Sequence, residues 1–166
     1  MKTDKVYLVG FMGCGKTTIA RALARRLGWG FVDIDEQVEK RERQSVATIF
    51  AKRGEPYFRA AERAVLLEQI PARHAVVATG GGTFVDPQNR AVIQQDGATV
   101  WLDVPLERLI MRVPSDGRRP LAADRVEFER LYAARRVAYA DAQYRVDVGL
   151  KSIPAIAEEL AHWLET

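Results

Sequence analysis

The sequence Gly10-Phe-Met-Gly13-Cys-Gly15-Lys16-Thr17 decides the fold of this 166-residue chain. It matches the pattern G-x-x-x-x-G-K-[ST], in which glycines let backbone N–H groups wrap around phosphates. Residues 5–10 before it read as a short buried strand, and residues 17–27 after it carry apolar side chains at helical spacing. A strand, a glycine-rich turn and a helix in this order predict a nucleotide-binding P-loop.

The residue types in the loop predict separate roles. Lys16 is expected to reach the β- and γ-phosphates of ATP, and the Thr17 hydroxyl to ligate Mg²⁺. The alternative is a tight glycine turn that binds nothing, which the Lys-Thr pair disfavours. The nucleotide-binding residues predicted here are Gly13, Cys14, Gly15, Lys16, Thr17 and Thr18.

Four more strands are predicted after the loop, each preceded by helical signals. They cover residues 31–35, 75–79, 98–103 and 144–148. Helices are expected between them, with Ser45 and Asp86 as caps and Pro56 near a helix start. This alternation predicts one domain over residues 1–166, a three-layer α/β/α P-loop NTPase fold with a five-stranded parallel sheet.

Polar and glycine residues gather where the predicted strands end. Gly80, Gly81 and Gly82 follow one strand, and parallel strands end at the same edge, so this cluster should share a crevice with the P-loop. Asp33 and Asp35 alternate along another strand and should face the same side. One carboxylate could hold Mg²⁺ while the other orients the attacking hydroxyl. The alternatives are a flexible turn for the glycines and solvated charges or a helix cap for the aspartates.

Residues 113–123 lack periodicity and are rich in Pro, Gly and Arg, which predicts a mobile lid between two helices. Arg118 and Arg119 lie in it, and an arginine on a closing loop can stabilise charge on a transferred phosphoryl group. Surface arginines are the alternative. Arg59 and Glu62 have the spacing of an ion pair within one helix.

Composition excludes several classes of protein. The charged fraction is 28% and the formal net charge is +3, with 19 Arg and 6 Lys. Arginine in excess suits anionic ligands, but biased codon usage is the favoured explanation for arginines outside the motifs. One cysteine allows no disulfide within the chain, and two histidines give no zinc cluster. We expect a cytoplasmic monomer that binds neither nucleic acid nor membranes.

Five features in order make the chain resemble the shikimate kinase family along its whole length. The family carries GFMGxGK[ST], D-x-D, I-F-x-x-x-G-E-x-x-F-R-x-x-E, T-G-G-G and R-P-L. The matching segments here are residues 10–17, 33–35, 49–62, 79–82 and 119–121. Residues 121–123 read Leu-Ala-Ala and depart from the family's usual extension of the last motif.

The resemblance implies ATP and Mg²⁺ as cofactors and shikimate as acceptor. It implies catalytic roles for Asp35, Lys16 and Arg119, and Mg²⁺ ligation by Thr17 and Asp33. Arg119 and Arg112 would also contact the nucleotide, the latter by packing on adenine. The implied shikimate-binding residues are Asp35, Arg59, Gly80, Gly81, Gly82 and Arg135.

One arginine of this set is placed by a motif that the chain matches only in part. The family has R-x-P-L-Y, whereas this chain reads Arg135-Arg-Val-Ala-Tyr139. Arg135 keeps the spacing to the tyrosine, and Arg136 remains the alternative. For the whole chain, a gluconate-type or nucleoside-monophosphate-type small-molecule kinase is the nearest alternative, and a nucleotide-binding module without catalysis is a second.

Overall fold

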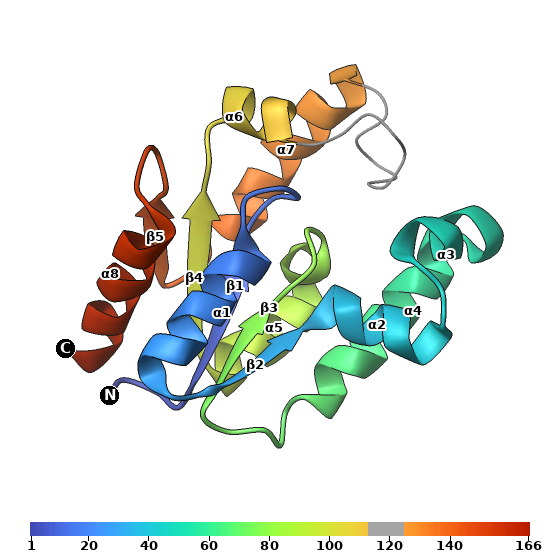
Figure 1. Cartoon of the computed structure of the whole chain (residues 1–166). Helices are drawn as coiled ribbons and strands as arrows, with labels where there is room; N and C mark the ends of the chain where they lie inside the picture. Colours follow the sequence, from blue (N-terminus) through green and yellow to red (C-terminus); the bar gives the residue numbers. More distant parts are fainter. Residues whose placement is uncertain (113–124) are drawn as a thin grey trace.

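A computed structural model describes residues 1–112 and 125–166, and its centre is a five-stranded sheet (Figure 1). The strands are β1 (Lys5–Val9), β2 (Gly30–Asp33), β3 (Ala75–Ala78), β4 (Ala98–Asp103) and β5 (Tyr144–Asp147). Their order in the sheet is β2-β3-β1-β4-β5, and every neighbouring pair is parallel. The predicted α/β class and parallel sheet are therefore confirmed.

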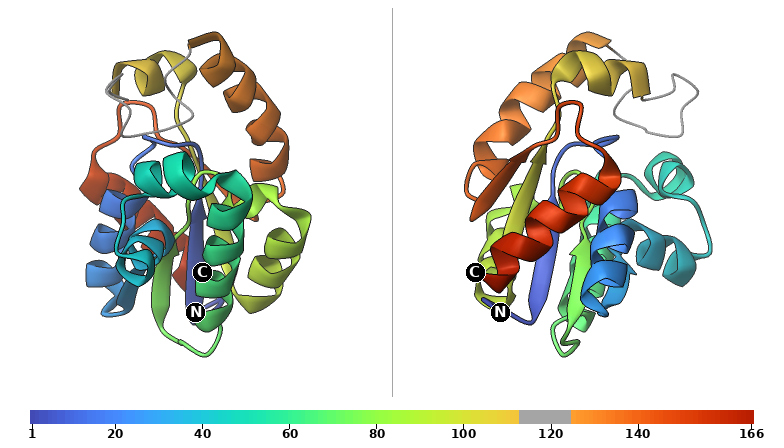
Figure 2. Two further views of the ribbon diagram at one scale, coloured as in Figure 1. Left: turned by 90° about the vertical axis from the view of Figure 1, so that its right-hand side faces the viewer. Right: turned by 60° about the vertical axis from the view of Figure 1, so that its left-hand side comes forward.

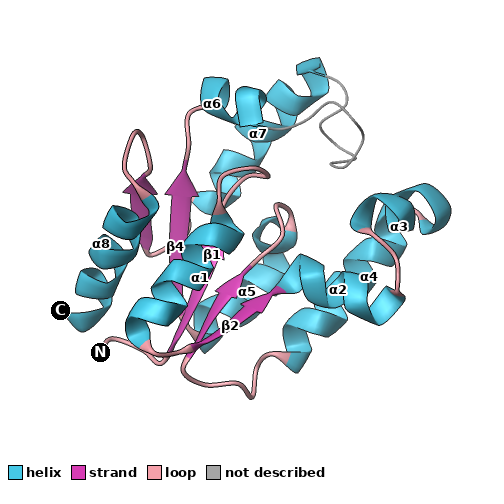
Figure 3. Cartoon of the chain, viewed as in Figure 1, coloured by secondary structure: helices cyan, strands magenta, loops and turns pink. Residues whose placement is uncertain are grey.

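Helices cover both faces of this sheet. Figure 2 shows α1 (Lys16–Leu27) and α8 (Ile153–Glu165) on one face and α5 (Pro87–Asp96) and α7 (Arg125–Tyr139) on the other. The remaining elements are α2 (Ile34–Glu42), α3 (Val46–Arg53), α4 (Glu55–Glu68), the 3₁₀ helix η1 (Thr83–Val85) and α6 (Leu106–Arg112). Figure 3 shows how α2, α3 and α4 form a projection beyond β2. None of the helices in the described parts of the chain is long and apolar enough to cross a membrane.

Side-chain caps start the helices where the sequence predicts. Ser45 accepts a hydrogen bond from the Thr48 N–H, and Asp86 accepts from two N–H groups of α5. Gly28 ends α1 in the left-handed conformation, with φ 70°. Local chemistry therefore sets these boundaries.

The strand expected over residues 31–35 is wrong in its second half. β2 ends at Asp33, whose side chain accepts a hydrogen bond from the Glu36 N–H and so caps α2. Asp35 lies in the first turn of this helix. Asp33 therefore reaches the cleft from the end of a strand, and Asp35 reaches it from a helix. The expectation that they face the same side because they alternate along one strand is wrong.

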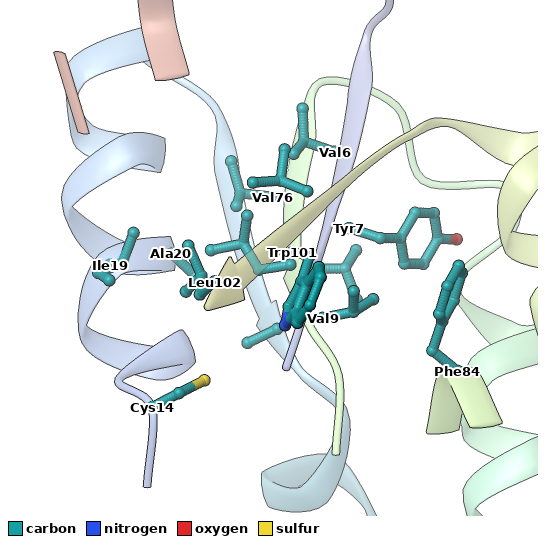
Figure 4. Packing of buried hydrophobic residues seen from close by; sticks show 14 of the residues in the cluster. Val6, Tyr7, Val9, Cys14, Ile19, Ala20, Val76, Phe84, Trp101 and Leu102 are labelled. Atoms are coloured by element: carbon teal, nitrogen blue, oxygen red, sulfur yellow. The ribbon is translucent and has the colours of Figure 1, made fainter. Parts of the chain in front are cut away.

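β1 is the middle strand and is buried from end to end. Val6, Tyr7, Leu8 and Val9 are each 0% exposed, as expected of a strand with helices on both faces. Figure 4 shows Ile19 and Ala20 of α1 to one side of this strand and Phe84 to the other. The single domain expected over residues 1–166 remains a prediction, supported by one hydrophobic cluster that includes residues of β1, β3, β4 and β5.

A charged cluster lies at the amino edge of the sheet, away from the P-loop. Lys5 begins β1 and is 0% exposed, and its Nζ lies 2.6 Å from Asp96 Oδ2. Tyr7 donates its hydroxyl proton to the same oxygen, and Arg73 donates to the other. Burial alone would raise the pKa of Asp96, but hydrogen bonds from Lys5 and Tyr7 outweigh it and lower the pKa. Asp96 therefore stays ionised and neutralises a buried lysine.

Candidate active site

A cleft of about 690 Å³ opens at the carboxyl edge of the sheet. Gly13 and Gly15 line it from the P-loop, and Gly81 lines it from the loop after β3. The prediction that both glycine clusters face one crevice is therefore confirmed, and the position agrees with the usual ligand site of open α/β sheets.

The P-loop turns tightly into α1. Gly15 precedes the helix with φ 95°, a left-handed conformation that a side chain would strain. Lys16 is only 9% exposed, and its Nζ donates hydrogen bonds to the carbonyls of Gly10 (2.6 Å) and Phe11 (3.0 Å). Thr17 and Thr18 line the cleft, whereas the Cys14 side chain is buried beneath the loop. The ammonium is thus held against the loop that would surround the phosphates.

Two oxygen donors suited to Mg²⁺ lie beside the lysine. The Thr17 hydroxyl donates to Asp33 Oδ2 at 2.5 Å, and both residues line the cleft. Among residues 1–112 and 125–166 there is no cluster of three His, Cys, Asp or Glu side chains that could hold a metal. Mg²⁺ usually keeps several waters and takes few protein ligands next to phosphates, so one hydroxyl and one carboxylate fit this ion.

Each glycine of the triple-glycine segment makes room for a side chain from a different helix. A methyl group placed on Gly80 would lie 2.6 Å from Asp35 Oδ1 of α2. One on Gly81 would lie 3.0 Å from an Arg135 nitrogen of α7, and one on Gly82 would lie 2.6 Å from Arg59 of α4. The segment therefore gathers one carboxylate and two guanidinium groups. The resemblance implied these residues as one shikimate-binding set, but it did not pair each of them with one glycine.

Arg59 and Glu62 form the ion pair that their spacing predicts, with Nη1 and Oε1 3.1 Å apart. Arg59 also contacts Glu55, at 3.1 Å. Glu62 is fully buried; burial raises its pKa, although the charge of Arg59 and the hydroxyl of Thr83 act in the opposite direction. Because Arg59 also lines the cleft, the ion pair with Glu62 holds the Arg59 guanidinium where a ligand in the cleft can contact it.

Thr83 belongs to this site and was missed from the sequence. Its hydroxyl donates to Glu62 Oε2 at 2.9 Å and accepts from the Gly80 N–H at 2.9 Å. The hydroxyl links the glycine segment to the carboxylate that holds Arg59. Its position directly after three glycines was the one signal that could have identified it.

The structure separates the two adjacent arginines of α7. Arg135 is 6% exposed and lines the cleft, with its guanidinium carbon 5.8 Å from the Phe11 ring centre. Arg136 points elsewhere and binds Asp103. Burial lowers the pKa of Arg135, and the nearby charge of Arg59 lowers it further. Of the two candidates, only Arg135 reaches the cleft.

The remaining predicted residues lie at the rim or beyond the described parts. Arg112, at the end of α6, lines the cleft, and its Nη1 lies 3.4 Å from the Gly13 carbonyl oxygen. The predicted lid, residues 113–123 with Arg118 and Arg119, falls outside the described residues. Gly80 and Gly82 are not among the residues that line the cleft; the side chains of Asp35 and Arg59, which do line it, lie against them.

Distant comparisons show the fold without separating functions. Deoxyadenosine kinase from M. mycoides superposes with a TM-score of 0.65 at 18% identity, covering 98% of this chain and 100% of that one. A sugar kinase from Janibacter sp. HTCC2649 superposes with a TM-score of 0.60 at 18% identity, covering 98% and 95%. At this identity the likeness concerns the fold alone.

Nearer comparisons identify the family. A sequence model described as shikimate kinase matches residues 12–165. Shikimate kinase from Persephonella marina is 40% identical over 156 residues, covering 93% of this chain and 95% of the relative. Shikimate kinase from Acinetobacter baumannii, solved in complex with shikimate, superposes with a TM-score of 0.93 at 33% identity, covering 98% and 93% of the two chains. The chain therefore belongs to the shikimate kinase family.

Proposed function

We propose that this protein transfers the γ-phosphoryl group of ATP to the 3-hydroxyl of shikimate, giving shikimate 3-phosphate and ADP for aromatic amino acid biosynthesis. The observation that carries the proposal is the grouping of Asp35, Arg59 and Arg135 around the triple glycine, in the same cleft as the P-loop. Two cations and one carboxylate suit an acceptor that carries both a carboxylate and hydroxyls. A neutral sugar would supply no anionic group for the two guanidinium groups to bind.

The acceptor is proposed to lie between α4, α7 and the glycine segment. Arg59 and Arg135 would bind the carboxylate of shikimate, because a guanidinium group makes two-point contacts with a carboxylate. A bound anion also relieves the unfavourable environment of Arg135, where burial and Arg59 both lower its pKa. Hydroxyls of the acceptor would contact Asp35 and the backbone of Gly81.

The nucleotide is proposed to occupy the P-loop side of the cleft. Lys16 would exchange its two carbonyl contacts for the β- and γ-phosphates, and successive loop N–H groups would bind the same oxygens. Thr17 and Asp33 would hold Mg²⁺, which neutralises charge on the phosphates when bound. Arg112 at the rim would pack on adenine.

Asp35 is proposed to orient the acceptor hydroxyl and take its proton. The hydroxyl oxygen forms a bond to the γ-phosphorus while the bond from that phosphorus to the bridging oxygen of ADP breaks. Lys16 stabilises the charge that develops on the phosphoryl oxygens, and Arg119 is proposed to assist from the predicted lid.

A coupled assay of ADP release tests the proposal against its alternatives. Shikimate, gluconate and nucleoside monophosphates are offered separately, each with ATP and Mg²⁺, and shikimate should be turned over far faster than the others. Turnover of another acceptor without shikimate turnover would overturn the proposal, and ATP binding without any turnover would favour a non-catalytic module.

The proposal also includes a monomeric state, which gel filtration tests. The predicted cytoplasmic location and the predicted lack of nucleic-acid or membrane partners rest on the sequence.

A further inference from the structure

Arg135 occupies a place that does not favour a cation. The residue is 6% exposed, and both burial and Arg59 lower its pKa. Tyr139, one turn further along α7, donates its hydroxyl proton to the Gly81 carbonyl, and Phe128 packs edge-on against Phe11 at 5.1 Å. The first contact holds the helix against the triple-glycine segment, and the second holds it against the P-loop. The direction in which Arg135 points depends on the rotation of this helix about its axis, so a constraint on that rotation also fixes the guanidinium.

The next residue supplies such a constraint. Arg136 binds Asp103 at two points, with Nη1 2.6 Å from Oδ1 and Nη2 3.3 Å from Oδ2. Its guanidinium carbon also lies 4.7 Å from the Trp101 ring centre, and its Nη1 donates to the Tyr132 hydroxyl at 2.9 Å. Hydrogen bonds to Asp103 raise the pKa of Arg136, opposite to the shift of Arg135. One of the two adjacent arginines is therefore firmly paired, and the other faces the ligand space.

Helix geometry couples these two side chains. Consecutive residues of an α-helix point about 100° apart, so fixing the direction of one fixes that of its neighbour. Asp103 is the last residue of β4 and its side chain is 8% exposed, which makes it a rigid anchor at the same edge of the sheet as the cleft. We propose that Arg136 and Asp103 are positioning residues, whose ion pair sets the rotation of α7 so that Arg135 meets the acceptor carboxylate. This inference rests on the proposed function.

The test compares two arginines that share one carboxylate. Arg145 of β5 binds the same Asp103, with its Nε 2.7 Å from Oδ2, but it does not belong to α7. Arg136→Ala should raise the shikimate KM about tenfold. The ATP KM should stay within about twofold, because the P-loop side of the cleft is unchanged. Arg145→Ala removes a partner of the same carboxylate and should leave both constants unchanged.

Conservative and paired variants separate positioning from a loss of stability. Arg136→Lys keeps the charge without the two-point contact and should give an intermediate shikimate KM. Asp103→Ala should raise the KM in the native background and add nothing to Arg136→Ala, because both remove the same contact. A thermal melt of each variant checks that the protein is folded at the assay temperature.

Two results would overturn the positioning role while leaving the proposed function intact. One is a shikimate KM for Arg136→Ala within twofold of the native value when Arg135→Ala raises it. The other is an equal rise in KM for Arg145→Ala, which would show a general effect of the Asp103 cluster. Failure of the native enzyme to turn over shikimate would instead overturn the proposed function, and the role assigned to Arg135 with it.

Discussion

Replacing Gly80 by alanine should displace the Asp35 carboxylate, the proposed catalytic base, without touching the nucleotide site. The added methyl group would lie 2.6 Å from Asp35 Oδ1, against an ordinary contact of at least 3.4 Å, so the carboxylate must retreat by about 0.8 Å. Glu62 Oε2 at 3.1 Å and Thr83 Oγ1 at 3.2 Å close off two other directions. The backbone of Gly80 is not in the left-handed region, so the substitution acts through this contact alone.

The expected loss follows from the size of this displacement. A misplacement of about 1 Å at a reacting group can cost about 100-fold in rate, so kcat for shikimate should fall by about 10- to 100-fold. The ATP KM should change less than about twofold. The extra methyl group in a packed site should also cost about 1–3 kcal/mol of stability, so the assay temperature is set well below the melting temperature.

Steady-state kinetics with coupled detection of ADP measure both constants. Gly30→Ala is the matched control, because its methyl group would meet no atom closer than His74 O at 3.8 Å, and its kinetics should equal those of the native enzyme. A folded Gly80→Ala enzyme with native kcat would refute the role given to Asp35 and the reading of the triple glycine as space for it.

Three further predictions use the same assays and urea unfolding. Gly82→Ala presses on the Arg59 guanidinium and should raise the shikimate KM about tenfold with the ATP KM unchanged; equal rises would contradict the carboxylate assignment. Asp35→Asn should lower turnover at least about 100-fold while ATP binding, followed by calorimetry, persists, and near-native turnover would exclude it as the base. Asp96→Asn leaves Lys5 buried without its counter-charge and should cost about 3 kcal/mol at pH 7. Because the folded-state pKa of Asp96 is lowered, this deficit should shrink as the pH falls below about 4, and a deficit independent of pH would contradict the ion-pair explanation.

The parts of the fold that local chemistry controls could be predicted from the sequence. The P-loop, the cap at Ser45, the left-handed glycine at position 28 and the parallel sheet all follow from patterns a few residues long. The boundary between β2 and α2 was wrong because Asp33 can serve equally as a strand residue or a helix cap. The contact with the Glu36 N–H, which only the folded backbone brings into reach, decides between them.

The site was predicted as a set of residues but not as an arrangement. Pairing each glycine of the trio with one functional side chain depends on contacts between segments far apart in sequence, such as Gly81 with Arg135. The choice between Arg135 and Arg136 depends on the rotation of α7, which Asp103 of β4 helps to set. The sequence of the helix alone therefore does not predict which of the two arginines faces the cleft. Residues 113–123 stay a predicted lid.

The charged cluster at the amino edge of the sheet has a practical consequence for engineering. Lys5, Tyr7, Arg73 and Asp96 form it at the end of the strands opposite to the cleft. Replacing a buried ion pair by well-packed apolar residues is often neutral or stabilising, so libraries at these positions could raise heat tolerance while the catalytic constants stay unchanged. Directed evolution of this enzyme could thus change thermal stability through positions at the amino edge and turnover through positions in the cleft, with little interference between the two.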